Sequence, residues 1–349
     1  MHLAPEGRFF QRNGSFHTLC RAAPIPRFRC KVCGKRFSRQ TFRIDYRDKR
    51  PQLNRRIAER LSSGTGLRRI ALALGVSRTT VERKFHKLGA HLRLLHEHTV
   101  GDFGAGAVAL VLDELETFET CRRTRPVTVA ALVEPDSYFI VGTRSATLPP
   151  RGRLQPADRA RVQRDARRFG KRQNRSAAAV GALLAFAARH CARAARITIR
   201  SDRKKSYPRL LRTAFGAARI DHLQVSSRAR RNTFNPLFPI NLTNAMLRDL
   251  MGRLHRRSWL ASKERRYLDQ HLGLAVVFRN YVRPWKNGAA EPPAVRLGFT
   301  DRAMTMPEMV SWRQDFGPEL SIHPLGRPGE TVGSYRRVMA KLRARRATG

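Results

Sequence analysis

The spacing of apolar residues changes its period near residue 100, and this change constrains the fold more than any other feature. Between residues 53 and 96, apolar side chains recur every three or four positions, as on one face of a helix. After the glycine-rich segment 101–106, short continuous apolar runs follow instead, which is typical of buried strands. These runs span 108–112, 127–133 and 138–141, the second broken only by Thr128. We therefore expect a helical unit followed by a sheet-containing unit.

The rest of the second unit alternates between helical and strand patterns. The expected elements are helices within 157–192, a strand at 197–200, a helix at 210–215, a strand at 220–225 and interrupted helix from 240 to 282. Three strands followed by this alternation predict a mixed α/β domain in which helices cover a central sheet. Residues 1–52 are punctuated by Gly and Pro and predict a small, loop-rich module.

The balance of charge indicates the class of partner. The chain has 70 Lys and Arg residues against 26 Asp and Glu residues, a formal net charge of +44. A compact fold with this charge repels itself unless a polyanion neutralises it, so nucleic acid is the expected partner. The sequence has no apolar run of membrane-spanning length, no secretion signal at its start and only five cysteines. We expect a cytoplasmic protein that does not enter a membrane.

Segment 67–81 has the spacing of a helix-turn-helix. Ala71 is small enough for two helices to approach, Gly75 suits the turn, and Val81 is expected to pack behind them. Ser77 would cap the second helix. An ordinary helical hairpin with a basic face is the alternative, but the charge balance favours DNA binding. The residues expected to contact DNA are Ser77, Arg78, Thr79, Thr80, Arg83 and Lys84, with Lys87 available for a phosphate.

Two cysteines are spaced as in a zinc knuckle. Cys30 and Cys33 are separated by two residues and followed by Gly34, so that a tight turn would aim both thiolates at one Zn²⁺ ion. One knuckle is half of a tetrahedral site. Cys20 is a further candidate ligand, although it belongs to no second pair. The sequence leaves open whether the module holds a complete zinc site or a knuckle without its mate.

Two aspartates follow apolar runs, which is informative in a chain with few acids. Asp113 follows the run 108–112, and Asp202 closely follows the run 197–200. Each aspartate alone is better explained as a turn or cap residue. On neighbouring strands, however, the two carboxylates would lie together and repel each other unless a cation separated them. Hard oxygen ligands select Mg²⁺ or Mn²⁺, which assist displacement at phosphorus.

With these motifs in this order, the sequence resembles bacterial insertion-sequence transposases, which join a zinc ribbon, a helix-turn-helix and an RNase H-like catalytic domain of the DDE type. The resemblance extends from about residue 28 to residue 284. Its most specific segments are 28–38, 112–119, Ser201-Asp202 followed by Tyr207, and 241–248. It implies a zinc-ribbon-like module at 1–52, a helix-turn-helix domain at 53–98, an RNase H-like catalytic domain at 104–285 and a basic C-terminal extension at 286–349.

Carried over by position, the resemblance places the catalytic, metal-binding residues at Asp113, Asp202 and Asn241. Most members have Glu at the third position, and one branch is similar to this chain in having Asn. The family's basic residue seven positions later falls on Arg248, which would hold a phosphate. Seven residues are within about 20° of two helical turns, so Asn241 and Arg248 would share a helix face. The role of Glu114, next to Asp113, stays open.

The activity implied is that of a transposase that binds terminal inverted repeats and catalyses metal-dependent DNA cleavage and strand transfer. It would act on double-stranded DNA as a homo-oligomer at the bacterial nucleoid, with Mg²⁺ or Mn²⁺ and, in the ribbon, Zn²⁺. The alternative is a DNA-binding regulator descended from a transposase that has lost catalysis. Counterion release gives both the same steep salt dependence of binding, so composition does not separate them. A third possibility is an RNA-processing nuclease on the same fold.

Overall fold

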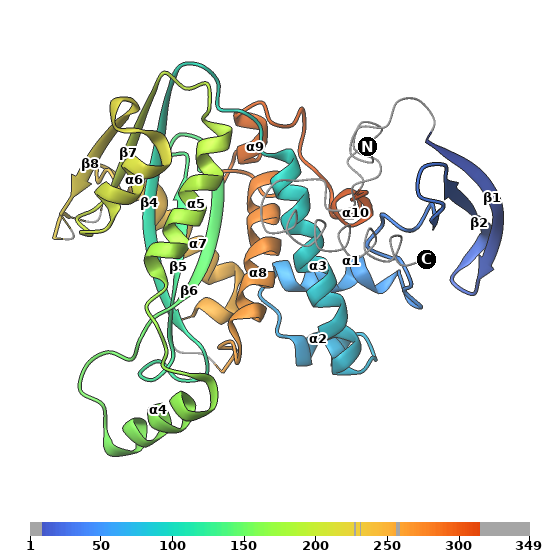
Figure 1. The fold of residues 1–349 in the computed structure, drawn as a ribbon, viewed down its shortest axis with the longest axis horizontal. Coiled ribbons are helices and arrows are strands. Elements are labelled where there is room, and N and C mark those ends of the chain that lie inside the picture. The colour runs from blue at the N-terminus through green and yellow to red at the C-terminus, as the bar shows by residue number, and fades with distance from the viewer. Residues whose placement is uncertain (1–8, 227, 231, 256–258, 315–349) are drawn as a thin grey trace.

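The computed structural model describes residues 9–314, apart from 227, 231 and 256–258. A small sheet, a group of helices and a larger α/β unit follow one another along the long axis of the molecule (Figure 1). Within these described residues, no helix combines the length and the apolar character needed to cross a membrane.

The small sheet is antiparallel, in the order β1-β2-β3. Its strands are β1 (Phe10–Thr18), β2 (Arg21–Cys30) and β3 (Arg36–Ser38). The sequence predicts a loop-rich region here, and the three strands are a correction to that prediction. Charged residues and turn formers interrupt the apolar pattern that would have indicated them. Aromatic rings supply the apolar contacts of the module, with centroids 5.1–6.3 Å apart. The rings are those of Phe9, Phe10, Phe28, Phe37 and Phe42.

The helical unit has the three expected helices and the expected turn. They are α1 (Leu53–Ser62), α2 (Leu67–Ala73) and the 22-residue α3 (Arg78–Thr99). Ala71 and Val81 are buried, and Gly75 has a φ of +60°, which suits glycine. Ser77 caps α3 by accepting a hydrogen bond from the backbone N–H of Thr80 at 3.2 Å. The geometry expected of a helix-turn-helix is therefore present.

The α/β unit contains a five-stranded mixed sheet in the order β6-β5-β4-β7-β8. The strands are β4 (Ala107–Phe118), β5 (Pro126–Val133), β6 (Ile140–Thr147), β7 (Arg196–Asp202) and β8 (Ile220–Val225). The first three form the expected antiparallel meander, and β7 and β8 run parallel to β4. The predicted mixed α/β layout is confirmed.

Helices lie on both faces of this sheet. One face packs on α5 (Ser176–His190) and α6 (Tyr207–Phe215), and the other on α7 (Phe238–Leu250) and α8 (Arg265–Val277). A further helix, α4 (Pro156–Phe169), stands apart from both faces.

The first part of the expected C-terminal extension packs back on the core. It contains α9 (Pro293–Arg296) and α10 (Met306–Ser311), which bury Ala294 and Met309. The basic end of the chain at 343–346 lies outside the described residues.

The backbones of α3 and α8 touch where two glycines meet. A Cβ atom on Gly89 would lie 2.6 Å from the carbonyl oxygen of Gln270, and one on Gly273 would lie 2.8 Å from the carbonyl oxygen of Gly89. Such a close approach leaves no space for a side chain. One hydrophobic cluster continues through this contact, from Ile57 of α1 to Val277 of α8. The helical unit and the α/β unit therefore share a core.

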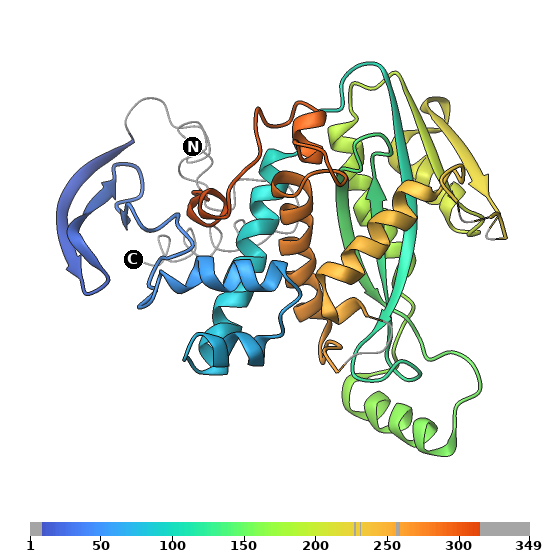
Figure 2. The ribbon, with the colours of Figure 1, turned by 180° about the vertical axis from the view of Figure 1, so that it is seen from behind.

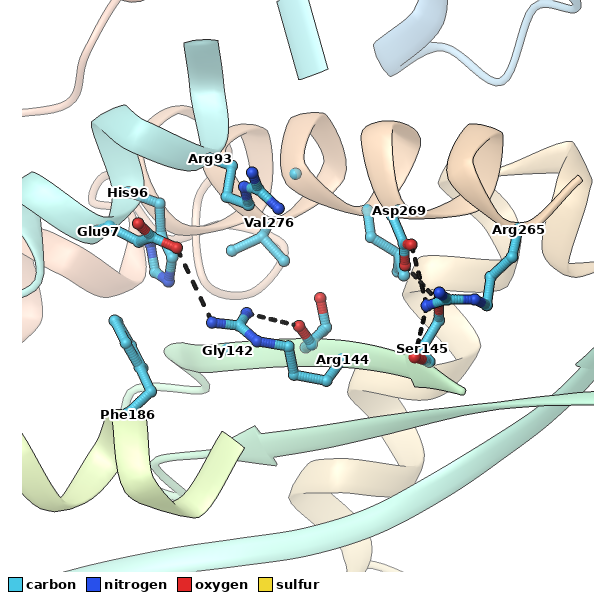
Figure 3. A pocket seen from close by; sticks show the side chains of 13 residues that line it. Arg93, His96, Glu97, Gly142, Arg144, Ser145, Phe186, Arg265, Asp269 and Val276 are labelled. Atoms are coloured by element: carbon cyan, nitrogen blue, oxygen red, sulfur yellow. Dashed lines mark hydrogen bonds and ion pairs between the residues drawn. The ribbon is translucent and has the colours of Figure 1, made fainter. Parts of the chain in front are cut away.

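The edge strand β6 is covered by side chains from three elements (Figure 3). The carbonyls of Val141, Thr143 and Ser145 accept hydrogen bonds from His96 Nε2 at 3.1 Å and from the side chains of Arg144 and Arg265, both at 2.9 Å. Burial lowers the pKa of His96 to about 3, so its imidazole is neutral. These groups line a pocket of about 230 Å³. We interpret these side chains as a cover that prevents the edge strand β6 from pairing with a strand of another molecule.

Replacing Gly89 by Ala tests the contact between α3 and α8. Overpacking against a backbone lowers the free energy of unfolding by up to about 3 kcal/mol, whereas the higher helix propensity of alanine raises it by about 1 kcal/mol. We expect Gly89→Ala to lower the free energy of unfolding by about 2 kcal/mol in urea denaturation. The matched control is Gly181→Ala in α5, where a Cβ would meet only Leu210, at 3.7 Å. This variant should be up to about 1 kcal/mol more stable than wild type. Equal stability of the two variants would contradict the contact.

Candidate metal-binding and catalytic site

The two aspartates singled out in the sequence lie side by side on neighbouring parallel strands. Leu112 of β4 pairs with Ser201 of β7, so the next residues on the two strands are Asp113 and Asp202. Adjacent strands are about 4.8 Å apart. The sequence places Asp113 at the end of its strand, but β4 continues to Phe118 because β5 still pairs with it there. The neighbouring strands β7 and β8 both end at this level, where Asp202 pairs with Val225, and their ends open the sheet beside the two carboxylates.

Both aspartates face α7. Successive side chains of a strand point to opposite faces. Asp113 has the same parity as Val111, which packs in the cluster with α7 and α8. On β7, Ile199 packs in the cluster with α5 and α6, so Asp202 points to the opposite face. The two carboxylates therefore share one face, while Glu114 points to the other.

Asn244 of α7 completes this arrangement. Its Nδ2 donates a hydrogen bond to Asp113 Oδ2 at 2.9 Å, and the residue is 5% exposed. Its Oδ1 is also buried and has no hydrogen-bond partner among the residues that the structure describes. A buried amide oxygen without a partner is costly, and it is a ligand of the kind that hard cations prefer. Two carboxylates and one amide thus form a candidate cation site.

Asn241 and Arg248 lie on the turns of α7 before and after Asn244. Positions three or four apart on a helix are neighbours on its surface, so the three side chains form one stripe. The Asn241 side chain is partly exposed and makes no hydrogen bond within the described part of the chain. Asn244 is not among the site residues predicted from the sequence. The signal was available, since a helical repeat places Asn244 and Arg248 on one face as readily as Asn241 and Arg248.

A polar network lies behind the aspartates on the other face of the sheet. Lys204 forms an ion pair with Glu114 and donates to Ser176 Oγ at 2.6 Å, and Ser176 Oγ donates to Glu114 Oε1 at 2.6 Å. The backbone N–H of Lys204 donates to Asp202 Oδ1 at 3.2 Å. Glu114, whose role the sequence leaves open, therefore anchors the segment that holds Asp202.

Tyr207 lies next to this network, with Lys204 Nζ 5.5 Å from the centre of its ring. Burial, together with the negative charges of Glu114, Asp202 and Asp113, raises the pKa of Tyr207 above its usual range. The phenol therefore stays protonated and neutral beside the carboxylates.

The start of α3 presents most of the predicted DNA-contacting residues to solvent. Ser77, Arg78, Thr79 and Arg83 are exposed, and Thr80 is partly exposed. The prediction for Lys84 is wrong, because its side chain is 1% exposed. Lys84 Nζ donates to Asp48 Oδ2 at 3.0 Å and to Asn54 Oδ1 at 2.7 Å. Lys84 follows Val81 by three residues, so it lies on the buried face of α3.

The ion pair of Lys84 joins α3 to the segment before α1. Burial favours a raised pKa for Asp48, but hydrogen bonds from Asn54, Lys84 and Lys87 outweigh burial and lower that pKa. Lys87, whose side chain is 35% exposed, donates to Asp48 Oδ1 at 3.1 Å. The predicted phosphate contact of Lys87 therefore competes with an internal partner.

The cysteines do not assemble as a complete zinc site within the described residues. Burial and the adjacent Cys30 thiol raise the pKa of the Cys33 thiol, so these two cysteines are neighbours. Cys20 is wrong as a third ligand. It lies at the opposite end of the β1–β2 hairpin, up to roughly 30 Å of extended chain from Cys30, and its thiol donates to the Lys49 carbonyl at 3.0 Å. Over the described ranges, no three His, Cys, Asp or Glu side chains gather as a metal site requires.

Comparison of the sequence with protein-family models gives no match, and comparison with curated proteins gives no significant match.

Neighbouring substitutions on α3 test the burial of Lys84. Lys84→Met leaves Asp48 buried without its main charge partner, and breaking a buried pair costs about 3–5 kcal/mol. We expect a loss of about 3 kcal/mol in the free energy of unfolding, because Asn54 and Lys87 still donate to Asp48. Arg83→Met, at an exposed position, should change that free energy by less than about 0.5 kcal/mol. Similar stability of the two variants in urea denaturation would show that Lys84 is not buried.

Proposed function

We propose that this chain is a DNA transposase that binds terminal inverted repeats and catalyses metal-dependent strand cleavage and strand transfer. One observation carries the proposal. Asp113 and Asp202 lie on neighbouring parallel strands, and Asn244, which donates a hydrogen bond to Asp113, has a buried amide oxygen without a partner among the described residues. This donor set fits Mg²⁺ or Mn²⁺.

Each side chain has a defined role in this proposal. Asp113, Asp202 and Asn244 would hold the ion, and Asn241, the position that the resemblance assigns, lies one turn away. When bound, the ion polarises a phosphoryl oxygen and offsets the repulsion of the two carboxylates. The Asn244 amide and the Lys204 backbone N–H hold the carboxylates of Asp113 and Asp202 by hydrogen bonds. Arg248, one turn beyond Asn244, is placed to bind a phosphate.

Other features support the proposal more broadly. The sheet order is compatible with the RNase H-like fold that the resemblance implies. The exposed start of α3 suits the major groove, and a charge of +44 suits duplex DNA. Action as a homo-oligomer on paired DNA ends at the nucleoid belongs to the same proposal. Cys30 and Cys33 would supply two thiolates of a zinc-ribbon-like module.

A second candidate function is that of a DNA-binding regulator without catalysis. It is favoured by the carboxylate count, since no third acid joins Asp113 and Asp202 among the described residues. With one negative charge fewer than a three-carboxylate site, a second divalent ion would bind less tightly. Mg²⁺-dependent cleavage of DNA by the purified chain distinguishes the two functions.

Conservative substitutions of the aspartates test the catalytic assignment. Asp113→Asn or Asp202→Asn should reduce Mg²⁺-dependent nicking of supercoiled DNA by about 1,000-fold or more, since metal catalysis supplies several kcal/mol. DNA binding should persist, because the helix-turn-helix is unchanged. The matched control is Asp221→Asn on β8, where Asp221 pairs with Arg196 at 2.9 Å. Wild-type nicking by either site variant, or equal loss in the control, would contradict the assignment.

A further inference from the structure

Helix α4 stands apart from the rest of the fold. It is inserted between β6 and α5 and lies beyond the ends of the strands that precede it (Figures 1 and 2). None of its residues is buried. Packing of an apolar face, which stabilises most helices in proteins, therefore does not explain why α4 is there.

The acids and the arginines of α4 have different surroundings. Its only acids, Asp158 and Asp165, are seven residues apart and thus lie on the same side. Both are paired with the body of the protein, Asp158 with Arg123 at 3.5 Å and Asp165 with Arg125 at 3.7 Å. The arginines of α4 are all exposed, namely Arg159, Arg161, Arg164, Arg167 and Arg168. The acids of α4 are consequently neutralised by arginines of the protein body, while its own five arginines face solvent and form a cationic surface.

A groove of about 640 Å³ has one wall next to α4 and another on α7. Arg123, which holds Asp158 of α4, lines the groove, and so does Arg248 of α7, one turn beyond Asn244. Arg122 and Arg151 also line it, and its acid, Glu116, is already paired with Arg151. The groove therefore places further arginines between the point where α4 is anchored and the stripe on α7.

We propose that α4 and this groove bind the sugar–phosphate backbone of duplex DNA where it leads away from the candidate metal site. The location of the DNA rests on the proposed function. Arginine forks bind phosphates in a bidentate manner. The exposed side of α4 lacks the apolar centre typical of protein interfaces, and its single large apolar side chain, Phe169, lies beneath the guanidinium of Arg168 at 5.0 Å. The phosphate backbone is therefore the better match than an acidic protein.

Charge-matched variants test this inference. In the first variant, Arg161, Arg164 and Arg168 of α4 become Gln. In the second, Arg189 of α5 and Arg209 and Arg212 of α6 become Gln, which removes the same charge from exposed positions on other helices. Binding of a long nonspecific DNA duplex is measured over a range of KCl concentrations. The slope of log K against log salt should fall by about 0.9 for each phosphate that the protein no longer neutralises, and so by about 3 in the first variant only.

An equal fall in both variants, or no fall in the first, would overturn the inference. Thermal unfolding of both variants should match wild type, since all six arginines are exposed. Changing the three α4 arginines to Lys should restore most of the slope. If poly-glutamate bound wild type as tightly as DNA and lost its binding in the first variant, the surface would be a site for acidic proteins and the inference would fail.

The outcome separates this inference from the proposed function. If wild type nicks DNA with Mg²⁺ while the α4 variant keeps the wild-type slope, only the inference about α4 fails. If wild type does not nick DNA while the slope falls as expected, α4 binds DNA and the transposase proposal fails.

Discussion

The contact between Gly89 of α3 and Gly273 of α8 determines how the two candidate functional surfaces of the molecule are related. The exposed start of α3 carries Arg78 and Arg83, whereas α8 covers the sheet face on which Asp113 lies. Two backbones in contact cannot slide or separate without opening the core. The sequence predicts separate domains at 53–98 and 104–285. In the structure, one hydrophobic core continues through both, so they are packed together. A DNA duplex on α3 would consequently have a fixed direction relative to the aspartates.

The central strands of the α/β unit could be predicted from the sequence because they are largely buried on both faces. The run 108–112 is apolar throughout and the run 127–133 is broken only by Thr128, as is typical of central strands. The second half of β4 escaped prediction because Glu114 and Glu116 interrupt the apolar run, although β5 pairs with this half throughout. Strands β1 to β3 were missed for a similar reason, since their contacts come from scattered phenylalanines and not from an alternating pattern.

The candidate site could be predicted where local order determines it and not where distant segments meet. Asp113 and Asp202 lie on strands that are parallel neighbours in the structure, so their proximity follows from strand order. The turn of α7 that reaches Asp113 depends on how the helix docks, which neither spacing nor resemblance determines. Asn244 was therefore missed beside Asn241. Lys84 shows the same limit, because its partner Asp48 is 36 residues away and no helical periodicity reveals a buried ion pair.

Because acids are scarce in this chain, most carboxylates are expected to be paired with a Lys or Arg side chain. Asp48, Glu114 and Asp158 are all paired with Lys or Arg, as expected where cations greatly outnumber acids. A divalent cation that approaches Asp113 and Asp202 must enter the positive field of this chain, which disfavours its binding. Phosphates bound along α4 and its groove would reverse that field locally. On the proposed function, DNA binding and metal binding are therefore coupled, and the duplex contributes the negative charge that a third carboxylate would otherwise supply.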